Sequence, residues 1–197
     1  MLSYLKEQAI RLNGTAKLSL PNKITLARIF IVPLIVVFLI RPSGWSNTIA
    51  GALFILASLT DWLDGHLARS RNQVTDLGKM LDPIADKILV AAGLIPLVAL
   101  GRVPVWMAVV LLGREFAVTG LRFISLSEGL TISASRLGKY KTILQVVAVS
   151  MLILHFKVLH FHIIGMLVLW VALFVSVISA VEYFINYWNP NHSQGTS

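Results

Sequence analysis

Four of the nine carboxylates in this 197-residue chain, Asp61, Asp64, Asp82 and Asp86, have spacings that could support chemistry. Asp61 and Asp64 are three positions apart and Asp82 and Asp86 are four apart, so each pair shares one face of an α-helix. Their surroundings are strongly apolar, where carboxylates repel one another and take up protons unless a cation compensates. Mg²⁺ and Mn²⁺ prefer carboxylate oxygens and keep positions open for phosphates. The pattern predicts a site at which two such ions hold a phosphoryl group.

Small residues accompany the aspartates on the same helix faces. Gly65 and Ala68 continue the first pair, and Gly78 lies four positions before Asp82, so a ligand has room to reach the backbone. Arg69 adds a guanidinium fork for phosphate. The alternative is that the aspartates are helix caps or ion-pair partners of nearby cations, but four at helical spacing beside glycines favour a site. The chain has no cysteine, which excludes thiolate ligands, whereas Zn²⁺ on carboxylates stays open.

The composition predicts the type of helix in which these residues lie. Hydrophobic residues make up 56% of the chain and charged ones only 13%, against about 25% charged in soluble domains. A membrane-spanning helix needs roughly 20 mostly apolar residues. Six segments meet this requirement and predict an all-α, polytopic membrane protein, at about 24–41, 47–66, 77–100, 103–125, 139–159 and 162–187.

The distribution of Lys and Arg predicts the orientation. With both termini inside, 14 of the 17 basic residues fall on the cytoplasmic side, and Arg41, Arg102 and Lys157 fall outside. This bias follows the positive-inside rule and predicts a multi-pass protein of the cell (inner) membrane with a cytoplasmic active site. We expect an amphipathic surface helix at 1–20, a catalytic membrane domain at 21–187 and a tail at 188–197. Because no basic, soluble module is present, nucleic acid is not expected as a partner.

A second group of residues could bind another phosphate. Arg114 lies inside an apolar run, where an unpaired cation is costly, so we expect its side chain to point into a site. Arg122, Lys139 and Lys141 follow at the inner ends of the fourth and fifth segments. The alternative for the lysines is ordinary cytoplasmic charge. Glu115, next to Arg114, is expected to face another side.

The aspartate pattern is that of a known family. Asp61-x2-Asp64-Gly65-x2-Ala68-Arg69-x8-Gly78-x3-Asp82-x3-Asp86 resembles the full signature of the CDP-alcohol phosphotransferases. Three further stretches, 20–28, 113–122 and 135–142, resemble the members that transfer a phosphatidyl group from CDP-diacylglycerol to sn-glycerol 3-phosphate. The resemblance covers about residues 20–187. It implies six transmembrane helices, a homodimer among membrane lipids, and a metal-bound donor near the cytoplasmic surface.

The resemblance also suggests a role for each candidate residue. Asp61, Asp64, Asp82 and Asp86 would hold the metals, and Asp86 would also take the proton of the acceptor hydroxyl. The residues expected to bind the donor are Asn22, Thr25, Asp64, Gly65, Ala68, Arg69 and Gly78. Those expected to bind the acceptor phosphate are Arg28, Arg114, Arg122, Lys139 and Lys141. Asn22 is equally suited to capping the first helix, and Arg28 to holding the donor.

Two alternatives remain at this point. Serine, inositol phosphate or phosphatidylglycerol could replace glycerol 3-phosphate as the acceptor. A metal-ion or proton transporter would also carry intramembrane aspartates. A transporter is expected to spread its acids along the membrane depth, often within a repeated bundle. Here the acids gather at one face and no repeat is visible, which favours the transferase.

Overall fold

The computed structural model describes residues 20–71, 76–127, 136–154 and 161–188, with a gap in the side-chain description at 20–25, 61–71, 76–82, 126, 136–137 and 139. The surface helix predicted at 1–20 and the tail predicted at 188–197 lie outside these residues, except that Leu20 begins α2 and Trp188 ends α7. Within them the chain forms six α-helices and no strand. The helices are α2 (Leu20–Ile40), α3 (Gly44–Arg71), α4 (Asp76–Ala99), α5 (Val105–Ser127), α6 (Arg136–Leu154) and α7 (Phe161–Trp188).

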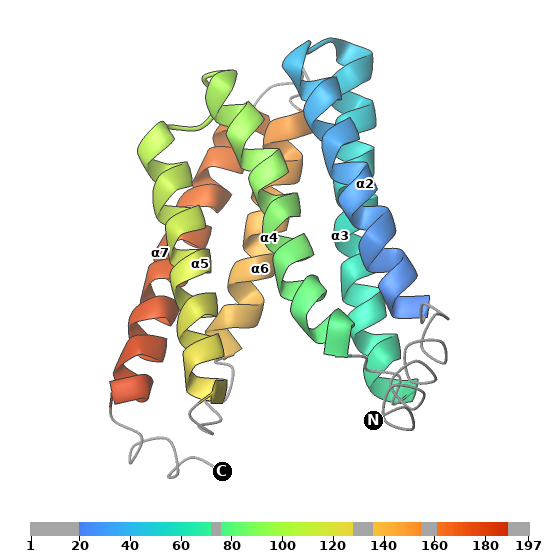
Figure 1. Ribbon diagram of the computed structural model, residues 1–197. Helices are drawn as coiled ribbons and strands as arrows, with labels where there is room; N and C mark the ends of the chain where they lie inside the picture. The colour runs from blue at the N-terminus through green and yellow to red at the C-terminus, as the bar shows by residue number, and fades with distance from the viewer. Residues whose placement is uncertain (1–19, 72–75, 128–135, 155–160, 189–197) are drawn as a thin grey trace, which may run out of the picture.

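The helices run up and down in one antiparallel bundle. Helix α2 begins and α7 ends at the same end of the bundle, the lower end in Figure 1, and the α2–α3 and α4–α5 turns lie at the opposite end. Each predicted apolar segment corresponds to one helix. The all-α prediction is therefore confirmed for the described residues.

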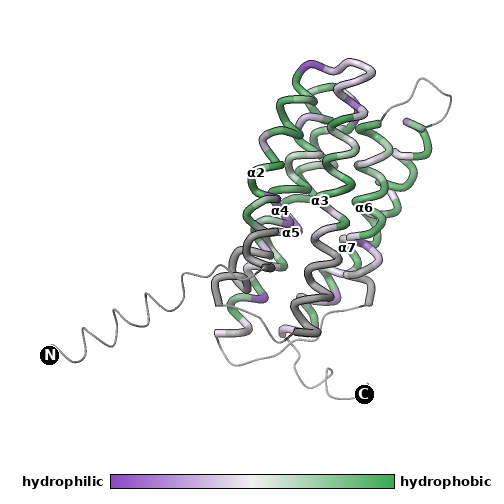
Figure 2. Tube along the Cα trace, turned by 90° about the vertical axis from the view of Figure 1, so that its right-hand side faces the viewer, coloured by the Kyte–Doolittle hydropathy of each residue, from purple (hydrophilic) through white to green (hydrophobic). Residues whose placement is uncertain are grey.

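Hydrophobic residues dominate the helices, and hydrophilic residues gather toward the two ends of the bundle (Figure 2). Among the described residues, only α7 has the length and hydropathy needed to cross a membrane. Shorter apolar helices cover Leu26–Ile40, Gly44–Thr60 and Tyr140–Leu154. The number of spans thus stays a prediction.

Close helix packing builds the core. Helix α6 packs most extensively against α7, and α2 packs against both α3 and α4. Phe54, Leu94 and Leu152 are fully buried in this core. At Gly93 the helices are so close that an added Cβ would lie 2.6 Å from Val149 Cγ1 and 3.0 Å from the Phe54 ring. Only glycine permits this approach between α4, α6 and α3.

A tight turn after α4 fixes the opposite end of the bundle. Gly101 has a φ of +67°, which glycine adopts without strain. The Gly101 amide donates to the Val98 carbonyl and the Arg102 amide to the Leu97 carbonyl, both at 2.9 Å, which is a Schellman motif. The Arg102 side chain then donates to the Leu152 carbonyl at 3.0 Å. The turn therefore ties α4 and α5 to the C-terminal end of α6.

Candidate active site

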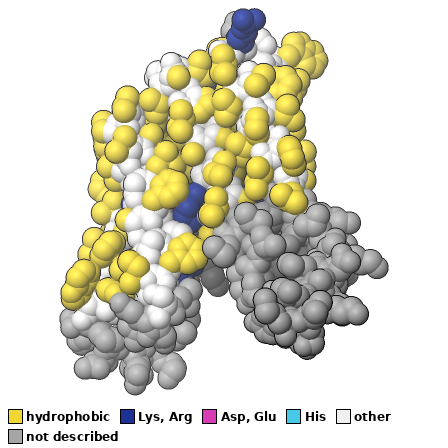
Figure 3. Space-filling model, viewed as in Figure 1, with side chains coloured by type: hydrophobic (Ala, Val, Ile, Leu, Met, Phe, Trp, Pro, Cys, Tyr) yellow, Lys and Arg dark blue, Asp and Glu magenta, His cyan; other side chains and the backbone are white. Residues whose placement is uncertain are grey.

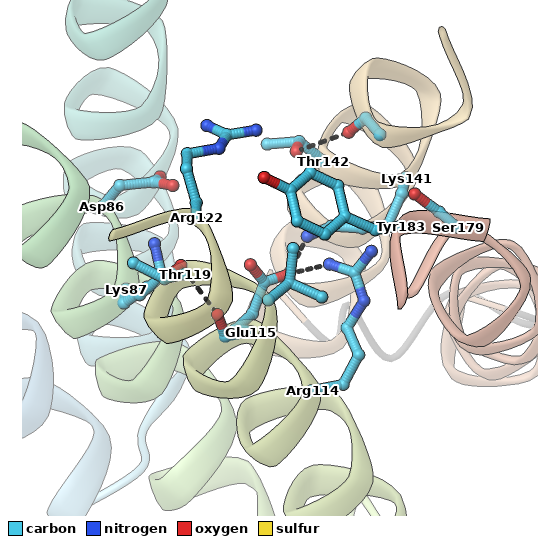
Figure 4. A pocket seen from close by; sticks show the side chains of 12 residues that line it. Asp86, Lys87, Arg114, Glu115, Thr119, Arg122, Lys141, Thr142, Ser179 and Tyr183 are labelled. Atoms are coloured by element: carbon cyan, nitrogen blue, oxygen red, sulfur yellow. Dashed lines mark hydrogen bonds and ion pairs between the residues drawn. The ribbon is translucent and has the colours of Figure 1, made fainter. Parts of the chain in front are cut away.

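A polar cavity of about 270 Å³ lies among α4, α5, α6 and α7. Figure 4 shows side chains from these four helices directed into it. Its described lining residues are Asp86, Lys87, Arg114, Glu115, Val118, Thr119, Arg122, Gly138, Lys141, Thr142, Ser179 and Tyr183. Four of them are cationic and two are carboxylates, so the cavity attracts anions.

The α4 wall carries the aspartate that the sequence singled out. Asp86 lines the cavity beside Lys87, whose ammonium donates to the Pro83 carbonyl at 2.9 Å. Lys87 is only 8% exposed, so this bond satisfies part of a largely buried cation. The helix thus holds Lys87 against its own backbone and presents the Asp86 carboxylate to the cavity.

The α5 wall carries an ion cluster that joins three helices. Arg114 Nε donates to the Ser176 carbonyl of α7 at 2.8 Å, and Arg114 Nη1 donates to Glu115 Oε1 at 2.9 Å. The same carboxylate oxygen forms an ion pair with the Lys141 ammonium of α6. The expectation that Glu115 faces another side was wrong. Neighbouring helix positions do diverge, but the long Arg114 side chain bends back to the carboxylate.

Tyr183 of α7 faces the cavity from the side opposite α4 (Figure 4). Its ring lies 6.0 Å from the Arg122 guanidinium carbon, at the outer limit of a cation–π contact. The residue is 5% exposed, and within the described part of the chain its hydroxyl has no hydrogen-bond partner. A buried, unsatisfied hydroxyl costs about 1–3 kcal/mol, so a ligand that bonds to it relieves this cost.

Tyr183 was not among the site residues predicted from the sequence. Its signal was the spacing of Ser176, Ser179 and Tyr183, which places three polar side chains on one face of an otherwise apolar α7. All three side chains are buried, whereas a helix face that packs only against apolar neighbours would carry apolar side chains. The polar face of α7 therefore indicates a polar cavity beside the helix.

The structure brings together part of the predicted acceptor group. Arg114, Arg122 and Lys141 line one cavity, and Asp86 lies on its wall. Arg28 is buried on α2 and is not among the described lining residues. The Lys139 side chain lies outside the described ones, as do those of Asn22, Thr25, Asp61, Asp64, Ala68, Arg69 and Asp82, and the surroundings of Gly65 and Gly78 are not described either.

The predicted metal site can be tested only in part. The backbone is helical at 61, 64, 82 and 86, as the argument from spacing requires. Among the described side chains no group of three or more metal-ligating residues occurs, and Asp86 is the one member of the aspartate set within them. Its carboxylate is an oxygen donor at a cavity wall, which suits a hard divalent cation. The other three proposed ligands, Asp61, Asp64 and Asp82, lie outside the described side chains, so the metal site stays a prediction.

Comparison with known families identifies the chain. The family model described as CDP-alcohol phosphatidyltransferase matches residues 18–178, which is most of the sequence. The chain belongs to this family. Members of the family are integral membrane enzymes that use divalent metal ions. The aspartate signature in helices α3 and α4 agrees with membership of this family.

Named relatives of this CDP-alcohol phosphatidyltransferase cover nearly the same length. A Bacillus subtilis CDP-diacylglycerol–glycerol-3-phosphate 3-phosphatidyltransferase is 47% identical over 185 residues, covering 86% of this chain and 95% of the relative. A Rickettsia typhi protein of the same name is 41% identical, over 84% of this chain and 95% of the relative. A probable phosphatidylglycerophosphate synthase of Mycobacterium tuberculosis is 37% identical, over 86% and 82%.

Proposed function

We propose that this chain transfers the phosphatidyl group of CDP-diacylglycerol to sn-glycerol 3-phosphate, giving phosphatidylglycerophosphate and CMP. The observation that carries the proposal is the cavity in which Arg114, Arg122 and Lys141 lie across from Asp86. The names of relatives at 47% and 41% identity support the same reaction.

The charge of the cavity favours a phosphorylated acceptor. A phosphate monoester carries about −1.5 to −2 charge at pH 7. Arg114 and Arg122 provide planar forks for its oxygens, and Lys141 provides a point charge. Serine has no phosphate to match these cations. The volume of about 270 Å³ is enough for a small phosphorylated acceptor.

The acceptor binds with its phosphate toward α5 and α6 and its free C1 hydroxyl toward α4. The Tyr183 hydroxyl donates a hydrogen bond to the acceptor, since this group is buried and has no partner among the described residues. Asp86 accepts the proton of the C1 hydroxyl. That oxygen forms a bond to the phosphorus that carries diacylglycerol, and the bond from this phosphorus to the CMP oxygen breaks. Positioning and electrostatic stabilisation supply most of the catalysis, as in other phosphoryl transfers.

The donor lies beside the acceptor, along α3 and the start of α4. Its proposed contacts are Asn22, Thr25, Asp64, Gly65, Ala68, Arg69 and Gly78. Arg28 is buried on α2, which packs against both α3 and α4. Asp61, Asp64, Asp82 and Asp86 would hold two Mg²⁺ or Mn²⁺ ions. When bound, such ions would supply positive charge that neutralises the phosphates of the donor.

The six helices, each 19–28 residues long, would cross the cell membrane with both termini in the cytoplasm. Hydrophobic side chains cover much of the face in Figure 3, and a patch of Lys or Arg lies between them. Such an arrangement gives a lipid-facing exterior with a polar entrance. Two copies would form the homodimer implied by the family.

Product analysis with a panel of acceptors tests the proposal. The purified protein is incubated with CDP-diacylglycerol, Mg²⁺ and either glycerol 3-phosphate, inositol 1-phosphate, serine or phosphatidylglycerol. We expect CMP and phosphatidylglycerophosphate in equal amounts with glycerol 3-phosphate, and no turnover after addition of a chelator. Preferential turnover of another acceptor would refute the assignment. Ion flux through proteoliposomes without CMP release would indicate a transporter.

A further inference from the structure

Glu115 is one of two carboxylates in a cavity lined by four cations, and unlike Asp86 it has no task in the reaction proposed above. Its side chain is 13% exposed, and those of its partners Arg114 and Lys141 are 10% and 7% exposed. A carboxylate beside an anion site repels the anion, so its presence there calls for another role. The contacts of Glu115 indicate what that role is.

One oxygen of Glu115 holds two cations from two helices. Oε1 accepts a hydrogen bond from Arg114 Nη1 at 2.9 Å and forms an ion pair with the Lys141 ammonium (Figure 4). Arg114 Nε is bound separately, by the Ser176 carbonyl at 2.8 Å. An arginine has five N–H donors and a lysine ammonium has three. Both cations therefore keep donors for a ligand while one side of each is fixed.

The carboxylate also balances charge. Without Glu115, Arg114 and Lys141 would be two neighbouring, mostly buried cations that repel each other in a medium of low dielectric. With it, the described lining has four cations and two carboxylates, an excess of two positive charges. A phosphate monoester of about −2 charge neutralises this excess. The cavity is thus matched to one phosphate dianion.

We propose that Glu115 is a positioning residue for the acceptor phosphate: it holds Arg114 and Lys141 together, with their remaining donors directed at one phosphate, before the acceptor arrives. The assignment of the phosphate to the acceptor rests on the proposed function. The pairing of the two cations by Glu115 rests on the contacts alone. Glu115 touches neither the reacting hydroxyl nor the donor and acts through its two partners.

Two substitutions separate this role from simple structural support. Glu115→Ala releases both cations, and we expect the KM for glycerol 3-phosphate to rise about 10-fold or more, because a buried charge pair loses one partner. Glu115→Gln keeps an oxygen acceptor of the same shape but removes the charge, so a smaller rise of about 3-fold is expected. The KM for CDP-diacylglycerol and kcat should stay within 2-fold of wild type. The reason is that the substitutions weaken acceptor binding equally in the ground state and in the transition state.

The matched control is Glu182→Gln on α7. Glu182 lines a separate, largely apolar groove beside Val181 and Ile185, and both KM values should stay at the wild-type level in this variant. If Glu115 only held the helices together, Glu115→Ala would lower the melting temperature and alter both KM values alike. That result, or a KM for glycerol 3-phosphate within 2-fold of wild type in both Glu115 variants, would overturn the proposal.

A binding measurement keeps the test independent of turnover. Inorganic phosphate is titrated against the purified protein in the presence of chelator, and the melting temperature is recorded. We expect phosphate to stabilise the wild type and Glu182→Gln, and to stabilise Glu115→Gln less, in proportion to its roughly 3-fold weaker binding. Equal stabilisation of all three would contradict the role of Glu115. A wild type that binds phosphate but releases no CMP would instead refute the proposed function.

Discussion

The two ends of this helix bundle are built in opposite ways. Toward the α4–α5 turn, Phe54, Leu94 and Leu152 are fully buried and Gly93 lets helices touch. At the cavity, buried charges of Arg114, Glu115 and Lys141 link the helices, and the Tyr183 hydroxyl has no hydrogen-bond partner within the described structure. One end is tightly packed and apolar, whereas the other contains buried polar groups whose burial costs free energy. Buried cations and an unsatisfied hydroxyl persist only where a tightly packed scaffold holds them.

The largest effect should come from the cavity end, at Asp86. Asp86→Asn removes the proposed proton acceptor, and we expect kcat to fall by about 10²–10⁴, the usual contribution of a general base. CMP release at saturating substrates measures this loss. Asp86→Asn should still bind CDP-diacylglycerol, which a binding assay in detergent can check. Near-normal turnover in the variant would exclude the base role.

Arg114 should rank second, because it contributes to both binding and local order. Arg114→Met keeps much of the length and apolar bulk but removes the donors to Ser176, to Glu115 and to the phosphate. We expect kcat/KM for glycerol 3-phosphate to fall about 10²-fold, in line with loss of a buried, hydrogen-bonded charge. Steady-state kinetics with varied acceptor provide the measurement. A fall confined to varied CDP-diacylglycerol would place Arg114 in the donor site instead.

The packed end should respond in stability and not in substrate affinity. Gly93→Ala places a Cβ 2.6 Å from Val149 Cγ1, and overpacking of this kind costs about 1–3 kcal/mol. Gly113→Ala is the control, since nothing lies within 4 Å of the added atom. Thermal unfolding in detergent should show a lower melting temperature for Gly93→Ala only. Both KM values should stay unchanged. A large rise in the KM for the acceptor in Gly93→Ala would show that the packed end also affects substrate binding.

Tyr183→Phe should give the smallest and most diagnostic change. Removal of an unsatisfied buried hydroxyl should leave the ligand-free protein as stable as before or up to about 1 kcal/mol more stable. The KM for glycerol 3-phosphate should nevertheless rise about 5-fold, as expected for one lost hydrogen bond of about 1 kcal/mol. Tyr140→Phe, on an exposed position of α6, serves as the control. Lower stability with unchanged KM would mean that Tyr183 is bonded within the protein.

The sequence predicted the helices well because apolar runs end at recognisable breaks. The segment expected at 103–125 is a helix at Val105–Ser127, and the one expected at 24–41 is a helix at Leu20–Ile40. The basic acceptor group was also partly predictable, since Arg114 interrupts an apolar run. Burying an unpaired arginine in apolar surroundings costs free energy, which predicted a polar site around it. The described structure has a polar cavity at this position.

The remaining features depend on side-chain conformations that helical periodicity does not specify. The direction of a Cβ suggested that Glu115 and Arg114 diverge, but flexible side chains of this length meet beyond the helix surface. Tyr183 was overlooked because one polar aromatic in a long apolar helix is also typical of a membrane interface. The close approach at Gly93 needs three helices to be placed together, which local sequence does not encode.

The central claim is that the charged cavity between α4 and α7 receives the acceptor phosphate beside Asp86. An experimental structure of the protein with bound glycerol 3-phosphate tests this claim most directly. We expect phosphate density in contact with Arg114, Arg122 and Lys141, with the free C1 hydroxyl directed toward Asp86 and another acceptor oxygen at the Tyr183 hydroxyl. Glycerol 3-phosphate bound elsewhere, with this cavity filled only by water, would contradict the account.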